Sequence, residues 1–208
     1  MKKTHCTFYI ARHGETVWNT ERVIQGQRDS PLTERGREQA EELARTLSDV
    51  AFDAVFSSDL GRAEATAEII ARPRGMSVQT SPLLREKRFG PFEGRPVEEL
   101  VRAHPDWDGA SDEERHRRKM SEDMESNEEV TARIITFLCQ SARRNPGKTV
   151  LAVCHGGVMR YLLIHLGVGS YAARPRIGNA GYIRLIGDGV HFEVSRLAGV
   201  IVPENEGE

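Results

Sequence analysis

The sequence predicts an α/β protein, a three-layer α/β/α sandwich in which helices cover both faces of a mostly parallel central sheet. Short apolar runs of strand length alternate with amphipathic segments of helical spacing. Two of these runs end at a histidine followed by glycine, and 208 residues suffice for one sizeable hydrophobic core. We therefore expect a single domain over residues 1–208, with a helical or loop insertion at about residues 90–127.

The first half of the chain supplies two strand–helix units. Strands are expected over residues 8–11 and 52–57, because both stretches are short, apolar and rich in β-branched or aromatic side chains. Thr33 is expected to cap a helix that runs to about residue 48, and Ser58 or Asp59 to cap the next helix. A further strand-like segment lies near residues 77–80. Such alternation is typical of parallel strands joined by right-handed crossovers.

Residues 83–127 break this alternation, and the predicted insertion covers about residues 90–127 of this stretch. Their polar part includes the basic run RHRRK at residues 115–119. A charged run of this kind is typical of a solvated helix face. A mobile lid is the alternative, since segments of this length between two βα units often cover a site, and basic side chains would attract an anionic substrate.

The second half returns to strand–helix units. A helix is expected from residue 128 to about residue 143, a buried strand over residues 149–154, and a further helix directly after His155. Two strands are expected at residues 181–186 and 190–197, because Asp188-Gly189 between them is a hairpin turn signal. The acidic tail after Pro203 is expected to lack regular structure.

Composition narrows the function classes. The 29 basic and 31 acidic side chains leave a formal net charge of −2, which argues against nucleic acid or an anionic membrane as partner and favours a small molecule. Three irregularly spaced cysteines indicate reduced thiols in the cytoplasm, with no zinc-type pairing. The N-terminal apolar run is interrupted by Arg12, so we expect neither a signal peptide nor a membrane anchor.

The repeated pattern of a strand followed by His-Gly is the main functional signal. Arg12 and His13 follow the first strand, and His155 follows residues 149–154. In one parallel sheet both histidines would emerge at the carboxyl edge, where helix N-termini also direct N–H groups at anions. A guanidinium beside an imidazole suits a phosphate held against a nitrogen nucleophile. Singly, these are ordinary loop or buried residues; the repetition favours a shared pocket.

Six short motifs occur in the order seen in the histidine phosphatase superfamily, also called the phosphoglycerate mutase-like family, which the chain therefore resembles. They are RHGETVWN, IQGQRDSPLTERG, SSDLGRAEATAEII, LREKRFGPFEG, VCHGG and NAGYIRL. They cover nearly the whole chain except the insertion. The sequence is most similar to the small bacterial phosphatases and probable phosphoglycerate mutases of that family, which implies phosphoryl chemistry with no cofactor and no metal ion.

The resemblance implies that one cluster of residues binds and attacks the phosphoryl group. His13 would attack phosphorus and become a phosphohistidine, while Arg12 and Arg62 bind the phosphoryl oxygens. Without the resemblance, Arg62 would read as a surface arginine on a helix. His155, as an imidazolium, and the backbone N–H of Gly156 would stabilise the developing charge.

The resemblance also implies a general acid. Glu86 would protonate the departing alkoxide, a contribution that is typically ~100- to 10,000-fold. Glu15 and Glu93 are competing carboxylates, which we expect to organise a loop and a turn instead.

Further positions match family motifs for substrate contact, and two positions depart from the pattern. The implied phosphate or substrate contacts are Thr16, Asn19, Gln25 and Gly26, with Lys87 and Arg88 nearby. Asp123 and Met124 stand where many relatives have two glycines before Glu-Ser, which weakens the expected lid contact. Glu64 replaces a further arginine of some relatives, so a second phosphate close by is not favoured.

Three alternatives accompany the expected phosphatase of small phosphorylated metabolites. A phosphoglycerate mutase would pass the phosphoryl group to a second hydroxyl, but the segment EKRFG and the modest insertion favour transfer to water. A phosphate-binding module without activity would be expected to lack the nucleophile or the acid. A metal-dependent hydrolase would need His13 and His155 to ligate a cation between two arginines. A homodimer is a candidate assembly.

Overall fold

The computed structural model describes residues 5–203, apart from the side chain of Asp108; the N-terminal lysines and the acidic tail lie outside these residues. The described strands form one sheet in the order β3-β2-β4-β1-β5-β6. The strands are β1 (Cys6–Arg12), β2 (Ala54–Ser57), β3 (Val78–Thr80), β4 (Thr149–Cys154), β5 (Arg176–Gly187) and β6 (Phe192–Ile201). The first four in sheet order, β3, β2, β4 and β1, are mutually parallel. Strand β5 runs antiparallel to both of its neighbours, β1 and β6.

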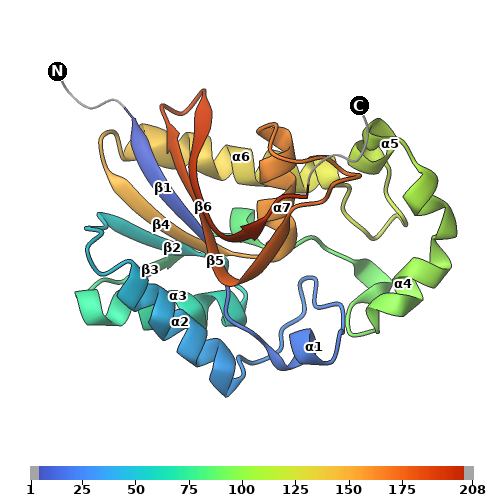
Figure 1. Ribbon diagram of the computed structural model, residues 1–208, viewed down its shortest axis with the longest axis horizontal. Helices are drawn as coiled ribbons and strands as arrows, with labels where there is room; N and C mark the ends of the chain where they lie inside the picture. Colours follow the sequence, from blue (N-terminus) through green and yellow to red (C-terminus); the bar gives the residue numbers. More distant parts are fainter. Residues whose placement is uncertain (1–4, 204–208) are drawn as a thin grey trace.

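The sheet is covered on both faces, which confirms the predicted three-layer sandwich (Figure 1). Helices α2 (Glu34–Thr46) and α3 (Gly61–Ala71) lie on one face, and α6 (Asn127–Arg144) and α7 (Gly156–His165) on the other. Side chains along β1 alternate between the two cores, with Phe8 and Ile10 in the core under α6 and α7, and Ala11 in the core under α2 and α3. This alternation follows from the two-residue period of a strand.

The register of the central strands brings the two histidines together. Strand β1 pairs with β4 from Thr7 opposite Thr149 to Arg12 opposite Cys154. His13 directly follows β1 and His155 directly follows β4, so the two histidines leave the sheet side by side at its carboxyl edge. The expectation of a shared edge is confirmed.

The predicted insertion is a series of short helices at the same edge. Figure 1 shows α4 and α5 together on one side of the molecule, with α1 apart from them. The short elements of the insertion are η3 (Gly90–Phe92), α4 (Val97–Ala103), η4 (Pro105–Gly109) and α5 (Asp112–Arg117). Outside it, the short elements of the described residues are α1 (Val17–Thr20), η1 (Arg72–Arg74) and η2 (Pro82–Leu84). In the basic run, Arg117, Arg118 and Lys119 form ion pairs with half-exposed or exposed carboxylates, as on a solvated face, whereas Arg115 is buried.

Two element boundaries differ from the sequence predictions for identifiable reasons. Neither Ser58 nor Asp59 caps α3: its N-cap is Leu60, and the Asp29 carboxylate accepts the N–H of Gly61 from a distant loop. Strand β5 begins at Arg176, five residues earlier than expected, because a register shift after Ile177 interrupts the alternation that marks a strand.

Candidate active site

His13 is oriented by its own loop. Its backbone N–H donates to the Cys154 carbonyl at 3.0 Å, which continues the pairing of β1 with β4. Its ring Nδ1 lies 2.7 Å from the Gly14 carbonyl oxygen. Because a carbonyl only accepts, Nδ1 carries the hydrogen of the neutral ring and Nε2 keeps its lone pair. The side chain is buried, so the lone pair of Nε2 is shielded from bulk water.

His155 lies beside His13 at the start of α7. The centroids of the two rings are 5.2 Å apart, and the ring planes are inclined at 59°. Both ring nitrogens of His155 are buried and have no hydrogen-bond partner among the described residues. A buried polar atom without a partner is unusual and points to a group that binds there.

Burial and nearby arginines keep both histidines uncharged. Burial lowers the pKa of His13 well below its ordinary value, and the Arg12 and Arg62 guanidinium groups lower it further. Burial, Arg62 and His13 lower the pKa of His155 in the same way. The expected imidazolium form of His155 is therefore not the form favoured in the free site. A bound phosphate dianion would oppose these effects and favour protonation of His155.

Two arginines are fixed by backbone carbonyls and keep one buried donor each. Arg62 Nη1 donates to the Arg28 carbonyl and to Asp29 Oδ1, both at 2.8 Å, and Nη2 donates to the Gly26 carbonyl at 2.8 Å. Arg12 Nη1 donates to the Ile177 carbonyl at 2.6 Å. The Nε atoms of both side chains are buried without a partner among the described residues. Arg62 is thus a buried residue, 2% exposed, and not a surface arginine.

The Glu86 carboxylate meets the N-terminus of α7. Its Oε2 accepts the N–H of Gly157 at 3.0 Å, and its Oε1 accepts the N–H of Lys87 at 2.8 Å. A Cβ on Gly157 would overlap this carboxylate, and a Cβ on Gly156 would lie 3.2 Å from Arg12 Nε. Both glycines are therefore required for close approach, and Glu86 joins the histidine and arginine cluster.

The competing carboxylates organise loops, as expected. Glu15 Oε1 accepts the hydroxyl of Thr33 at 2.9 Å. Glu93 Oε1 accepts the backbone N–H groups of Gln27 at 3.0 Å and Phe89 at 2.9 Å. Both carboxylates serve the loops that surround the site.

The predicted substrate contacts form one hydrogen-bonded loop. Thr16 caps α1, and its hydroxyl accepts from the Asn19 N–H at 3.3 Å and from Gln25 Nε2 at 2.8 Å. Asn19 Oδ1 accepts from Asn179 Nδ2 at 3.3 Å, and the Gly26 carbonyl holds Arg62. Their direct contact with substrate stays a prediction.

Lys87 and Arg88 bind other parts of the chain. Lys87 Nζ donates to Asn127 Oδ1 at 2.7 Å, and burial lowers its pKa to about 8. The exposed Arg88 donates from Nε to the Asp123 carbonyl at 2.9 Å. Both side chains connect the residues after Glu86 to the start of α6.

Sequence analysis missed two residues that support the site. Asp29 caps α3 and pairs with Arg62, and the hydroxyl of Thr66 accepts the N–H of Gly14 at 3.1 Å. Asp29 lies within a family motif, but its role depends on a contact 33 residues away along the chain. Thr66 follows Arg62 by one helical turn, which was the available signal.

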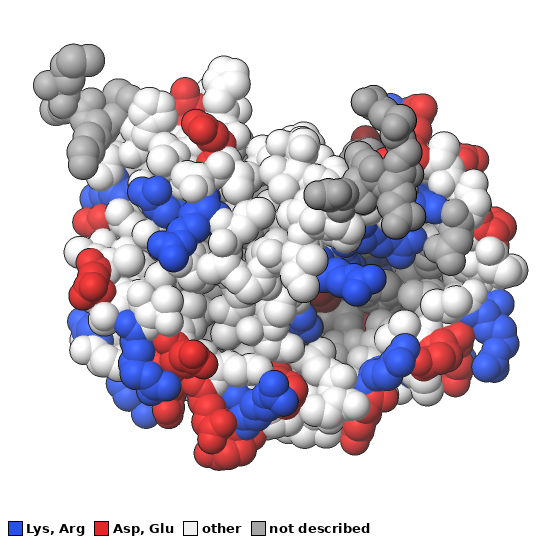
Figure 2. All heavy atoms as spheres, in the orientation of Figure 1, with Lys and Arg blue, Asp and Glu red and all other residues white. Residues whose placement is uncertain are grey.

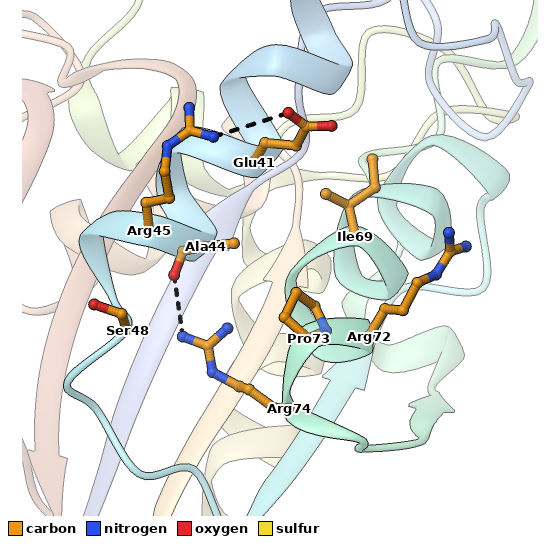
Figure 3. Close-up of a pocket in the computed structure, with 8 residues that line it drawn as sticks. All are labelled: Glu41, Ala44, Arg45, Ser48, Ile69, Arg72, Pro73 and Arg74. Atoms are coloured by element: carbon orange, nitrogen blue, oxygen red, sulfur yellow. Dashed lines mark hydrogen bonds and ion pairs between the residues drawn. The ribbon is translucent and has the colours of Figure 1, made fainter.

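The face shown in Figure 2 is hollowed between the sandwich and the α4–α5 segment, and Lys and Arg side chains border the hollow. A separate cavity of about 540 Å³ lies between α2 and α3 (Figure 3), lined by Arg74, Ile69 and other residues, none of them a predicted site residue. Within residues 5–203, no group of three or more His, Cys, Asp or Glu side chains is arranged to hold a metal ion. No helix in that range is long and apolar enough to cross a bilayer.

Comparison with known proteins places this geometry in context. The model of the histidine phosphatase superfamily (branch 1) matches residues 8–198. Two curated relatives are each named a probable phosphoglycerate mutase GpmB. The one from Enterobacter sp. is 36% identical over 184 residues, and the one from Yersinia pestis 38% over 179 residues. Each match covers 85% of this chain and 83% of the relative.

Solved structures share the fold over nearly the whole chain. Bacillus stearothermophilus YhfR superposes with a TM-score of 0.82 at 32% identity, over 91% of this chain and 95% of that one. A phosphoserine phosphatase from Entamoeba histolytica, in complex with 3-phosphoglyceric acid, gives a TM-score of 0.79 at 26% identity, over 93% and 96% of the two chains.

Proposed function

Because this chain belongs to the histidine phosphatase superfamily (branch 1), we propose that it hydrolyses monoesters of small phosphorylated metabolites through a phosphohistidine on His13, without a metal ion. One observation carries the proposal: four buried nitrogens around His13 lack partners among the described residues. They are Arg12 Nε, Arg62 Nε and both ring nitrogens of His155. Each unpaired buried donor costs ~1–3 kcal/mol. A phosphoryl group would accept from the two guanidinium Nε–H groups and from one N–H of the His155 ring, and so remove that cost for these donors.

The first half of the reaction transfers the phosphoryl group to the protein. The lone pair of His13 Nε2 attacks phosphorus, a P–N bond forms, and the P–O bond to the alcohol breaks. Arg12, Arg62 and His155 bind the oxygens on which charge is concentrated. Glu86, as the general acid, gives a proton to the departing oxygen, so that an alcohol leaves.

The second half returns the enzyme to its starting state. Water attacks the phosphohistidine, and the Glu86 carboxylate accepts a proton from that water. The P–N bond breaks, inorganic phosphate is released, and Glu86 is again protonated. The same carboxyl group thus acts first as acid and then as base.

The names of the relatives favour a second candidate. Both curated relatives cited here are named probable phosphoglycerate mutases, whereas the solved structure from Entamoeba histolytica is named a phosphatase. The two activities share the first half-reaction and differ in which hydroxyl receives the phosphoryl group. We favour transfer of the phosphoryl group to water, because the chain has the segment EKRFG and only a modest insertion. The proposed partner is a small phosphorylated metabolite, because the formal net charge of −2 does not favour nucleic acid or an anionic membrane. The proposed location is the cytoplasm, because the cysteines are free.

The test is phosphate release from a panel of phosphorylated metabolites and an aryl phosphate, with a chelator present. We expect release by the wild type and by His191→Ala, whose side chain is exposed on the β5–β6 hairpin, and none by His13→Ala. Release that the chelator abolishes, or that survives in His13→Ala, would contradict the mechanism. Isomerisation of phosphoglycerate without phosphate release would establish the mutase instead.

A further inference from the structure

The loop that carries Glu86 is held by an arginine from another element. Residues 85–89 have no regular secondary structure after η2. Arg133, in the second turn of α6, donates from Nη1 to the carbonyls of Leu83 at 3.1 Å and Arg85 at 3.0 Å. Its Nη2 lies 3.5 Å from the Glu86 carbonyl. The carbonyls of Leu83, at the end of η2, and of Arg85 and Glu86, in the loop, therefore converge on a single guanidinium.

Arg133 is itself fixed by a carboxylate. Its Nε lies 2.8 Å from Glu125 Oε1 and its Nη2 lies 2.9 Å from Glu125 Oε2. Two parallel charge-assisted hydrogen bonds are strong and directional. The side chains of Arg133 and Glu125 are only 20% and 12% exposed, so water competes little.

The same carboxylate also reaches the far side of Glu86. Glu125 Oε2 accepts the backbone N–H of Arg88 at 2.8 Å. The chain before and after Glu86 is thus tied, through Arg133 and Glu125, to the start of α6. Because α6 packs on α7, whose Gly157 N–H binds the Glu86 carboxylate, the loop and its carboxylate share one support.

We propose that Arg133 is a positioning residue for the general acid: it sets the place of Glu86 beside the phosphoryl site without touching the substrate. This inference rests on the proposed function, because it requires Glu86 to be the acid. The position needs arginine, since a guanidinium offers five donors in a fixed plane. A lysine ammonium at the same place could not serve three carbonyls and both carboxylate oxygens.

The test uses the leaving group. An alkoxide needs a proton as it leaves, whereas p-nitrophenolate is a weak base and hardly needs one. We expect Arg133→Gln and Arg133→Lys to lower kcat/KM about 10- to 100-fold on the best alkyl phosphate of the panel, the range expected for a displaced catalytic group. The ratio kcat/KM is the measure because it covers only the steps up to release of the alcohol, whereas kcat also includes hydrolysis of the phosphohistidine, which is common to all substrates. On p-nitrophenyl phosphate kcat/KM should fall less than about threefold, because the phosphate-binding arginines are untouched.

Arg74 supplies a matched control. It also donates to three carbonyls, those of Ile70 at 2.7 Å, Ala44 at 3.2 Å and Leu47 at 2.7 Å. It lies between α2 and α3, beside the cavity of Figure 3 and away from the site. Arg74→Gln should shift the urea midpoint, as Arg133→Gln does, yet leave the ratio of alkyl to aryl kcat/KM at the wild-type value.

Glu86→Gln separates the two claims. It should reproduce the selective loss on alkyl phosphates in a larger form. If it does, and the Arg133 variants lower the activity on alkyl and aryl phosphates equally or on neither, the positioning role is overturned and the proposed function stands. If Glu86→Gln itself shows no preference between the two leaving groups, the general acid is misassigned and the inference fails with it.

Discussion

The two halves of the candidate site are built in different ways. His13 and His155 leave adjacent parallel strands, so main-chain pairing of β1 with β4 sets their separation. Glu86 stands on an irregular loop, and side chains from α6 and the segment before it set its position. The half for which we propose phosphoryl binding therefore depends on the sheet, and the half for which we propose proton donation depends on a few side chains. Substitutions in the first half should affect every substrate, and substitutions in the second mainly those with poor leaving groups.

The largest expected effect is in the phosphoryl-binding half. Arg62→Gln removes a charged donor that would bind the phosphoryl oxygens, and we expect kcat/KM to fall about 100- to 1,000-fold. The loss should be the same for alkyl and aryl phosphates, as measured by steady-state kinetics on both. A selective loss on alkyl phosphates would break the distinction between the halves. Arg117→Gln, at an exposed ion pair on α5, should behave as wild type.

Gly157→Ala should give the next largest effect, and it acts on the half of the site that holds Glu86. The new Cβ would occupy the place of the Glu86 carboxylate, which must move. We expect kcat/KM on alkyl phosphates to fall about 10- to 100-fold while kcat/KM on aryl phosphates is largely spared. Gly156→Ala is the comparison, because its Cβ meets only the Arg12 side chain, at 3.2 Å. Its smaller loss should be equal for both substrates.

The buried histidines predict how stability depends on pH. Both have lowered pKa values in the folded protein, so below about pH 6.5 the unfolded chain binds more protons and stability falls as the pH falls. Each histidine contributes at most about 1.4 kcal/mol per pH unit. Urea midpoints at pH 7.5 and 5.5 should differ more in the wild type than in a His13→Gln, His155→Gln double variant. Equal differences would contradict the neutral, desolvated histidines.

The smallest effect concerns the support of Arg62. Asp29→Ala removes the cap of α3, and we expect the free energy of unfolding to fall by about 1 kcal/mol. Asp29→Asn should lose less, because its amide oxygen can still accept the Gly61 N–H. Denaturant unfolding of the two variants checks this order. Equal losses in the two variants would mean that the charge of Asp29 toward Arg62, which both variants remove, and not the acceptor for the Gly61 N–H, carries its contribution.

Local patterns in the sequence were enough to predict where β1 and β4 end and which side chains lie near those ends. Apolar runs identified β1 and β4, and family motifs identified His13, Arg62 and Glu86. What could not be predicted depends on contacts between distant residues: Asp29 with α3, and Arg133 with the loop of Glu86. The start of β5 was missed because an irregular stretch breaks the two-residue alternation on which strand prediction depends.

The place of β1 in the sheet has a consequence for synthesis on the ribosome. β1 is the first strand to be made, yet it lies between β4 and β5, the fourth and fifth strands to be made. The carbonyl that holds Arg12 belongs to Ile177, 165 residues later. At about 5–20 residues per second, the first strand waits roughly 10–30 s for its neighbours. A nascent chain that stops before β5 would therefore carry His13, Arg62, Glu86 and His155 and still lack the carbonyl that holds Arg12.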